Sequence, residues 1–215
     1  MTLRRSFLGA LATLSLASVL LAAAGPSAPA AAATTPAPPT GPGGSPTATH
    51  YWLATASGGV YPMGGEPSLG SPAGLTLARP IVGITPTRSN RGYWLVASDG
   101  GVFTYGDAGY FGSTGGIALN QPIVGMEPTP DGGGYWLVAA DGGIFTFGDA
   151  GFYGSTGAVR LDKPIIGMAA TPDGKGYWLF ASDGGIFTFG DAGFYGSTGG
   201  VRLNQPIVAM TPTPD

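Results

Sequence analysis

The chain has 215 residues, of which 43% are hydrophobic and 10% charged, so it is long enough for one packed domain but carries little solubilising charge. It contains no cysteine, which excludes disulfides, thiolate metal sites and a cysteine nucleophile. The formal net charge is −3. Because phosphate binding needs a cationic surface, a nucleic-acid partner is not expected.

The first 33 residues have the pattern of an export signal. Arg4 and Arg5 precede an apolar run over residues 7–24, and small residues follow, as in a cleaved secretory leader. The stretch RRSFL at 4–8 also resembles the twin-arginine motif, so the general and the twin-arginine export routes both stay open. An uncleaved membrane anchor is the alternative, because 18 apolar residues are just enough to cross a bilayer.

We expect cleavage of this leader, since small-residue clusters at 22–24 and 31–33 offer cleavage sites. The expected product is a secreted, extracellular protein that has no membrane contact and is associated with the cell wall or free. Residues 34–47, TTPAPPTGPGGSPT, combine proline and glycine and are predicted to be a linker.

From Ala48 onward the chain repeats with a period of 42 residues. A Tyr-Trp pair marks each copy and begins at residues 51, 93, 135 and 177. Residues 48–215 therefore divide into four units, which are 48–89, 90–131, 132–173 and 174–215. Repetition at this period is typical of architectures in which each unit is completed by its neighbours.

Each unit contains four short runs rich in β-branched and aromatic residues. One set of runs is 164–173, 177–182, 185–190 and 193–198, and Asp-Gly and Gly-Asp turns separate them. Glycine and proline recur too often for a helix. The sequence therefore predicts an all-β protein with four-stranded antiparallel units, in which the first run, PIVG or PIIG, is the innermost strand.

Four-stranded units of this length match the blades of a β-propeller. The first unit begins just before a second strand, at His50, whereas the fourth unit ends with residues 206–215, which repeat the first strand. We therefore expect this last segment to supply the missing strand and close a four-bladed ring, which removes exposed sheet edges. An open fragment of a longer propeller array is the alternative.

The sequence motifs of the repeat also resemble a known family. GYWLVASDGGVFTYGDAGYFGSTGG at 92–116 is similar to the secreted propeller-type repeats of actinobacteria. It is more loosely similar to chromosome-condensation-regulator-like and WD40-like propeller repeats. The resemblance covers residues 48–215 and implies a β-propeller fold and an extracellular location, and it carries no catalytic residues over to this chain.

The inventory of side chains argues against an enzyme. His50 is the only histidine, and Glu66 and Glu127 are the only glutamates. These residues do not suffice for a Ser-His-Asp triad or a histidine-rich metal site. Most aspartates stand in glycine turns, which favours backbone capping over a catalytic carboxylate pair. We expect no catalytic residue, no metal and no cofactor.

Two features that recur at the 42-residue period are the candidate binding groups. The aspartate of each GDAG motif could accept hydrogen bonds from sugar hydroxyls or bind a hard cation, and turn capping is the alternative. The aromatic pair that follows could stack on sugar rings, and packing between blades is the alternative. The tryptophan of each unit is expected in the core. The candidate ligand-binding residues are Asp107, Asp149, Asp191, Tyr110, Tyr153 and Tyr195.

The predicted function is a secreted, non-catalytic binding or adhesion module at the cell surface, with a cell-wall polysaccharide or a surface protein as its partner. A purely structural secreted repeat protein without a small-molecule ligand is the alternative. The first unit has Gly65 and Pro67 where the third has Asp149 and Gly151, so such a site has at most three copies. A monomer is expected.

Overall fold

The computed structural model describes residues 50–213, which form eleven β-strands and no helix. The predicted all-β class is therefore confirmed for this part of the chain. The predicted signal peptide, 1–33, and linker, 34–47, lie outside the described residues. The strands are β1 (Tyr51–Ala54), β2 (Val60–Met63), β3 (Ile81–Pro86), β4 (Gly92–Ala97), β5 (Val102–Gly106), β6 (Ile123–Pro128), β7 (Gly134–Ala139), β8 (Ile144–Gly148), β9 (Ile165–Ala170), β10 (Gly176–Ala181) and β11 (Ile186–Gly190).

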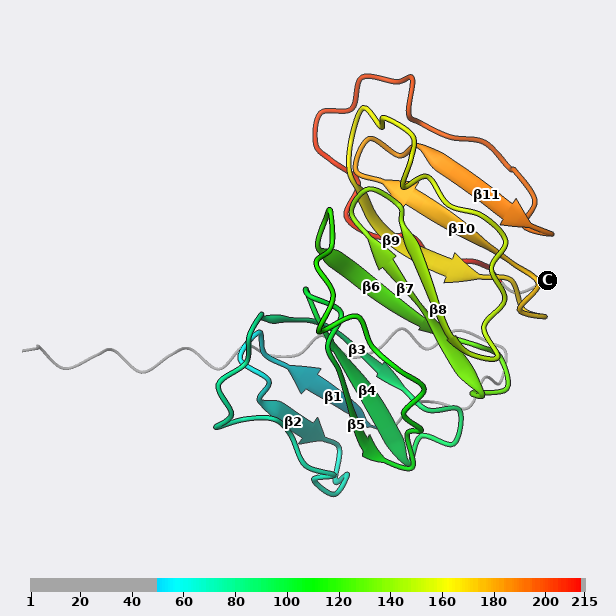
Figure 1. The fold of residues 1–215 in the computed structure, drawn as a ribbon. Coiled ribbons are helices and arrows are strands. Elements are labelled where there is room, and N and C mark those ends of the chain that lie inside the picture. The colour runs from blue at the N-terminus through cyan, green and yellow to red at the C-terminus, as the bar shows by residue number, and fades with distance from the viewer. Residues whose placement is uncertain (1–49, 214–215) are drawn as a thin grey trace, which may run out of the picture. The chain divides into compact units, whose positions relative to one another are not determined.

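The strands form four antiparallel sheets (Figure 1), and each three-stranded sheet joins the last strand of one repeat unit to the first two strands of the next. The first sheet consists of β1 and β2, and the other three have the orders β3-β4-β5, β6-β7-β8 and β9-β10-β11. The Tyr-Trp pair lies in the central strand of every three-stranded sheet. Short runs of β-branched and aromatic residues between glycine-containing turns favour such hairpins.

The prediction of a fourth strand in each unit is wrong. The run assigned to it, 193–198 in the last unit, contains no strand, and neither do its counterparts in the other units. In the second unit the backbone of the equivalent run, 109–114, binds elsewhere: the Tyr135 hydroxyl of the next unit donates to Gly112 O at 2.6 Å, and Thr114 N donates to Gly100 O at 3.1 Å. Glycine within the run disfavours a ladder, so the run connects two units instead of widening one sheet.

Successive sheets contact one another through their first strands. β3 packs against β6, β6 packs against β9, and β1, which has no first strand beside it among the described residues, packs against β3. The first run of the repeat is therefore the strand nearest to the neighbouring units, as its predicted innermost place requires.

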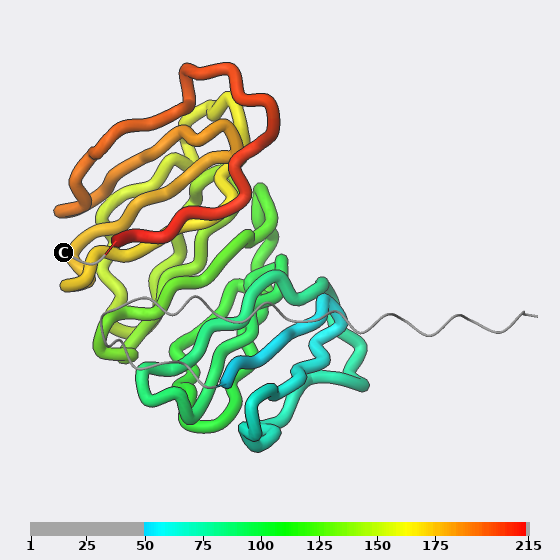
Figure 2. Tube along the Cα trace, turned by 180° about the vertical axis from the view of Figure 1, so that it is seen from behind, coloured from blue at the N-terminus to red at the C-terminus, as the bar shows by residue number. Residues whose placement is uncertain are grey.

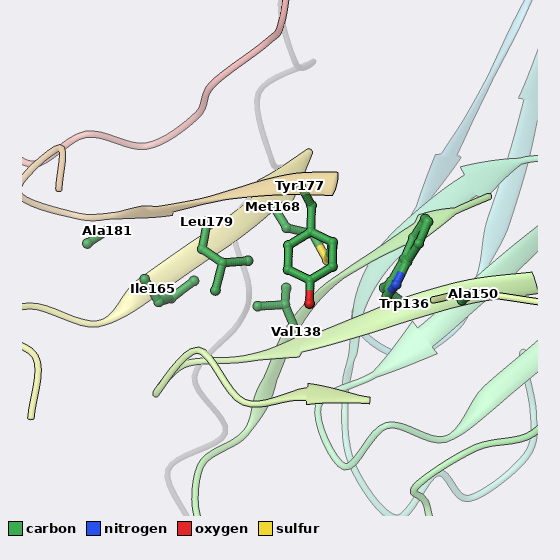
Figure 3. Packing of buried hydrophobic residues seen from close by; sticks show 8 residues of the cluster. All are labelled: Trp136, Val138, Ala150, Ile165, Met168, Tyr177, Leu179 and Ala181. Carbon is green, nitrogen blue, oxygen red and sulfur yellow. The ribbon is translucent and has the colours of Figure 1, made fainter. Parts of the chain in front are cut away.

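The central strands are buried on both faces. All six residues of β7 are buried. Tyr135 and Leu137 belong to the hydrophobic cluster shared with the preceding sheet, whereas Trp136 and Val138 belong to the cluster shared with the following sheet, which Figure 3 shows. Alternate residues of a strand point to opposite faces of the sheet. Each hydrophobic cluster among the described residues thus lies between two sheets rather than within one.

A tyrosine of one unit and a tryptophan of the unit before it form the centre of each interface. The ring centroids of Trp136 and Tyr177 are 5.9 Å apart. The Tyr177 hydroxyl donates to Gly154 O at 2.6 Å, and Trp136 Nε1 donates to Gly151 O at 2.7 Å. Both buried polar groups are therefore satisfied, as buried groups must be. The interface one unit earlier repeats these contacts with Trp94, Tyr135, Gly112 and Gly109.

The first interface keeps the ring contact but loses one hydrogen bond. Trp52 and Tyr93 have ring centroids 5.4 Å apart, and the Tyr93 hydroxyl donates to Gly70 O. Trp52 Nε1, however, is buried without a hydrogen-bond partner among the described residues. In the other units the acceptor is a glycine carbonyl, and the first unit has Pro67 at that position. The first interface therefore lacks the tryptophan hydrogen bond that the other two interfaces contain.

The closed four-bladed ring expected from the sequence is not observed. Among the described strands, β1 contacts only β2 and β3. Residues 206–213, drawn in red in Figure 2, form no strand. Instead Ile207 N donates to Ser182 O at 2.8 Å. Ile165 N makes the equivalent bond to Ala140 O at 2.8 Å, so the last segment enters the array as the start of another unit would.

Candidate functional site

Polar and aromatic residues gather at one end of each sheet. In the third sheet Gly134 and Gly148 face each other in the register of β7 and β8. The turn at 129–133 and Asp149 therefore lie side by side just beyond that pair. We call this the aspartate end of the sheet. The hairpins between the second and third strands form the opposite end.

The three candidate aspartates occupy equivalent places at the aspartate end. Thr129 Oγ1 donates to Asp149 Oδ1 at 2.9 Å. The two other units have the same bond, from Thr87 to Asp107 at 2.8 Å and from Thr171 to Asp191 at 3.0 Å. Each carboxylate thus ties the turn between the first two strands to the end of the third. One oxygen of each aspartate is used in this way.

Asp107 is held more tightly than its counterparts by its neighbours. Hydrogen bonds from the Ser89 and Thr87 hydroxyls lower the pKa of Asp107 below its ordinary value, and the Arg91 charge lowers that pKa further. The ion pair itself, Arg91 Nε to Asp107 Oδ2 at 3.6 Å, is exposed, and exposed ion pairs stabilise a fold little. The hydroxyls, rather than the arginine, therefore keep this carboxylate ionised.

The structure divides the candidate tyrosines between two different positions. The first ring of each aromatic pair faces solvent, because Tyr110, Phe152 and Phe194 are 60%, 61% and 61% exposed. The second ring packs against the next unit. The ring centroids of Tyr153 and Tyr177 are 5.7 Å apart, and the Tyr153 hydroxyl donates to Gly174 O at 2.9 Å. Tyr195 is 91% exposed because no described unit follows it.

The candidate set Tyr110, Tyr153 and Tyr195 is therefore not one repeated series. The positions equivalent to Tyr110 are Phe152 and Phe194, each 42 residues after the last. The candidate set was restricted to tyrosine because of its hydroxyl group, and it therefore left out Phe152 and Phe194. The 42-residue period identifies these two phenylalanines, since equivalent positions of a repeat share one environment.

A cavity of about 440 Å³ opens at the aspartate end, among the turns of the second, third and fourth sheets. Its wall includes the three threonines that bind the aspartates. Arg88 Nη1 reaches from one turn to the next and donates to Pro130 O at 2.6 Å. Glu127 is the one acidic side chain in the lining. The lining residues that the argument uses are Thr87, Arg88, Trp94, Glu127, Thr129 and Thr171.

Glu127, in β6 of the third sheet, has no acidic counterpart in the repeat, because the equivalent positions are Thr85, Ala169 and Thr211. Burial raises the pKa of Glu127 to about 7, although a hydrogen bond from the Ala170 backbone lowers it in part. A carboxyl group of this kind changes between a hydrogen-bond donor and a pure acceptor near neutral pH. Sequence reasoning passed over Glu127 as a site residue, since burial depends on tertiary contacts.

The other side chains that could act in catalysis or bind a metal ion do not lie close together among the described residues. His50 Nε2 lies 3.1 Å from Glu66 Oε1 in the first unit. Within residues 50–213, no three His, Asp or Glu side chains come close enough to bind a metal ion. The same residues include no helix with the length and apolar character that a membrane crossing needs.

Comparison with known proteins adds no assignment. No protein-family model matches this chain, and no curated protein matches it.

We predict that Glu127 makes stability fall as pH rises. Because the pKa of Glu127 is raised in the folded state, the unfolded chain loses this proton near pH 4.5 and the folded chain only near pH 7. The neutral carboxyl therefore stabilises the fold fully below pH 4.5, and this contribution is lost up to about pH 7. Urea unfolding across this window should show a loss of about 1–3 kcal/mol that Glu127→Gln abolishes.

The matched control is Asp162→Asn, at an exposed carboxylate. This variant should keep the pH profile of the parent chain. If the parent and Glu127→Gln lost stability in parallel between pH 4.5 and 7, burial of Glu127 would not be the cause.

Proposed function

We propose that this chain is a secreted, non-catalytic β-propeller module that binds cell-wall polysaccharide. In this proposal the four sheets are blades, and the ring is completed when residues 206–213 pair with the free edge of a β1 strand. Sheets that follow one another through their first strands support the blade arrangement. The leader pattern at 1–33 supports export.

The observation that carries the binding proposal is a series of exposed rings at the 42-residue period. Tyr110, Phe152 and Phe194 are each about three-fifths exposed, and each stands three residues after an aspartate of the aspartate end. Aromatic faces stack on sugar rings, and carboxylates accept hydrogen bonds from sugar hydroxyls. Equal spacing along the array matches a ligand that is itself a repeating polymer.

The affinity of such a surface comes from repetition. One ring and one carboxylate contribute on the order of 1 kcal/mol, which is too little for stable binding alone. Once the polymer is bound at one of three such sites on a rigid array, its effective concentration at the other two sites is raised. The proposal therefore requires a long glycan and gives a monosaccharide little affinity.

A purely structural role is the second candidate. It is supported by the threonine bonds of Asp107, Asp149 and Asp191, which occupy one oxygen of each carboxylate within the fold. In that case the exposed rings are surface residues without a ligand, and the chain acts as a rigid spacer or binds a surface protein.

We predict that replacing Tyr110, Phe152 and Phe194 by Ser abolishes most binding to purified cell-wall polysaccharide. Removal of three stacking contacts, each worth about 1 kcal/mol, lowers affinity at least tenfold. Co-sedimentation of the full secreted chain with the insoluble polymer measures this loss.

The matched control replaces three exposed aliphatic residues by Ser at the same period: Ile117, Val159 and Val201, which are 61%, 56% and 59% exposed. They follow threonines that bind the hairpins at the opposite end of the sheets, such as Thr114, whose hydroxyl donates to Asp99 O at 3.0 Å. The control triple should bind as the parent does. Equal binding by the aromatic triple, or no binding by the parent, would favour the structural role.

We also predict that export removes the leader. Protein collected from the culture medium should begin after one of the small-residue clusters at 22–24 or 31–33, because signal peptidases cleave after such residues. Amino-terminal sequencing measures the start. Secreted or membrane-bound protein that still begins at Met1 would contradict cleavage.

A further inference from the structure

Two charged side chains that depart from the repeat line the same cavity at the aspartate end. Arg88 stands where the equivalent turns have Pro130 and Pro172, and Glu127 stands at a strand position that is not acidic in the other sheets. Among the described residues, these two are the only charged side chains in the lining. The repeat is thus altered at two places that are separate in the sequence and meet in one cavity.

The Glu127 carboxyl group has no cationic partner in the part of the chain that the structure describes. The backbone N–H of Ala170 donates a hydrogen bond to it, and this bond is the one contact that lowers its pKa. A carboxylate has about four lone-pair sites, so most of its hydrogen-bonding capacity is left for a ligand. Burial without a counter-charge makes the ionised form costly, and a bound cation offsets that cost.

The Arg88 guanidinium group is held in place with most of its donors unused. Arg88 is exposed, and its Nη1 donates to Pro130 O in the next turn at 2.6 Å. Among residues 50–213 it makes no ion pair and no other hydrogen bond. A guanidinium has a planar fork of N–H groups that matches a carboxylate. Arg88 therefore offers a place for the carboxylate of a ligand.

The two charges do not neutralise each other. Arg88 lies in the turn between β3 and β4, whereas Glu127 lies in β6 of the next sheet. The charge of Arg88 is not among the causes that shift the pKa of Glu127, so the guanidinium group lies too far away to act as its counter-ion. The cavity thus presents one negative and one positive group at separate places.

The rest of the lining combines apolar surface with polar groups that are already used. The indole N–H of Trp94 donates to a backbone carbonyl, and the three threonine hydroxyls donate to the aspartates. Recognition of charge therefore falls to Arg88 and Glu127, and the surface around them accommodates an aliphatic chain. The apolar side chains of the lining are Pro86, Trp94, Pro128, Pro130, Ala170 and Pro172.

We propose that this cavity binds a small aliphatic zwitterion, with the ammonium group of the ligand on Glu127 and its carboxylate on Arg88. The aliphatic chain between the two charges lies against Trp94 and the prolines. A volume of about 440 Å³ is within the range of small-molecule sites. The inference goes beyond the proposed glycan binding, because none of the three exposed rings belongs to the lining of this cavity.

A series of ω-amino acids tests the site, because aliphatic chains of different length separate their two charges. The probes are glycine, γ-aminobutyrate and ε-aminocaproate, each with the alkylamine and the carboxylate of the same chain length as single-charge controls. They are titrated into the full secreted chain at about pH 8, above the pKa of Glu127, where the carboxyl group is ionised. The NMR signal of the Trp94 indole N–H reports binding, and that of Trp136, which lies outside the lining, is the internal reference.

One ω-amino acid should shift the Trp94 signal at the lowest concentration, because its length matches the spacing of the two charges. Its single-charge controls should bind about tenfold more weakly, since each of them loses one charged hydrogen bond. If no ω-amino acid shifted the Trp94 signal, or if an alkylamine or a carboxylate bound as tightly as the best ω-amino acid, the proposal would be overturned.

Charge-removing variants assign the two roles. Glu127→Gln and Arg88→Gln should each lower the affinity for the best ω-amino acid about tenfold, because each removes the charge of one pair. The matched control is Arg91→Gln, at an exposed cation of the same turn that lies outside the lining, and it should bind as the parent does. An unchanged affinity in Glu127→Gln or Arg88→Gln, or an equal loss in the control, would contradict the assignment.

Two further variants carry residues that the repeat already has at the equivalent positions. Glu127→Thr introduces the residue found at Thr85, and Arg88→Pro introduces the residue found at Pro130, so the fold should accept both. Each should keep the melting transition of the parent and lose binding of the ω-amino acid. Binding at parental affinity by either variant would overturn the proposal.

The glycan and zwitterion sites fail separately in this design. The triple variant in which Tyr110, Phe152 and Phe194 are Ser should bind the ω-amino acid as the parent does, because these rings lie outside the cavity. Glu127→Thr should still sediment with cell-wall polysaccharide. Loss of ω-amino acid binding in a folded triple variant would place the zwitterion on the exposed rings and contradict the cavity assignment.

Discussion

The contact between a tyrosine of one sheet and a tryptophan of the sheet before it is the interaction on which the other features depend. It fixes the spacing of the sheets, because the tyrosine hydroxyl reaches a glycine carbonyl in the connection between two units. In the second and third units the same hydroxyl also binds backbone N–H groups of that connection. The contact places the hydrophobic core between neighbouring sheets.

A shared core explains both the regular face and the irregular ends of the array. Within the array, each turn at the aspartate end is held by the same threonine and aspartate bond, so the exposed rings of Tyr110, Phe152 and Phe194 are displayed in equivalent surroundings. At the two ends of residues 50–213, the outer face of the first or last sheet has no described sheet packed against it.

The 42-residue period and its short apolar runs predicted the all-β class and the central strands, because local propensity and tertiary packing agree there. It failed at the run 193–198 and its counterparts, where aromatic residues indicated a strand but the structure has none. It also failed for closure, since the angle between sheets depends on packing that no local pattern encodes. The series of exposed rings was predicted in part: the period identifies Phe152 and Phe194, whereas preference for a hydroxyl led to Tyr153, which packs against Tyr177.

The central claim is that each core belongs to two sheets at once, and a double-mutant cycle tests it most directly. Trp136→Phe and Tyr177→Leu change two rings in one interface, with centroids 5.9 Å apart. Their effects on the free energy of unfolding should be coupled by about 1 kcal/mol. Trp94→Phe and Tyr177→Leu lie in different clusters and should be additive within about 0.5 kcal/mol. Additivity of the first pair, equal to that of the second, would contradict the claim.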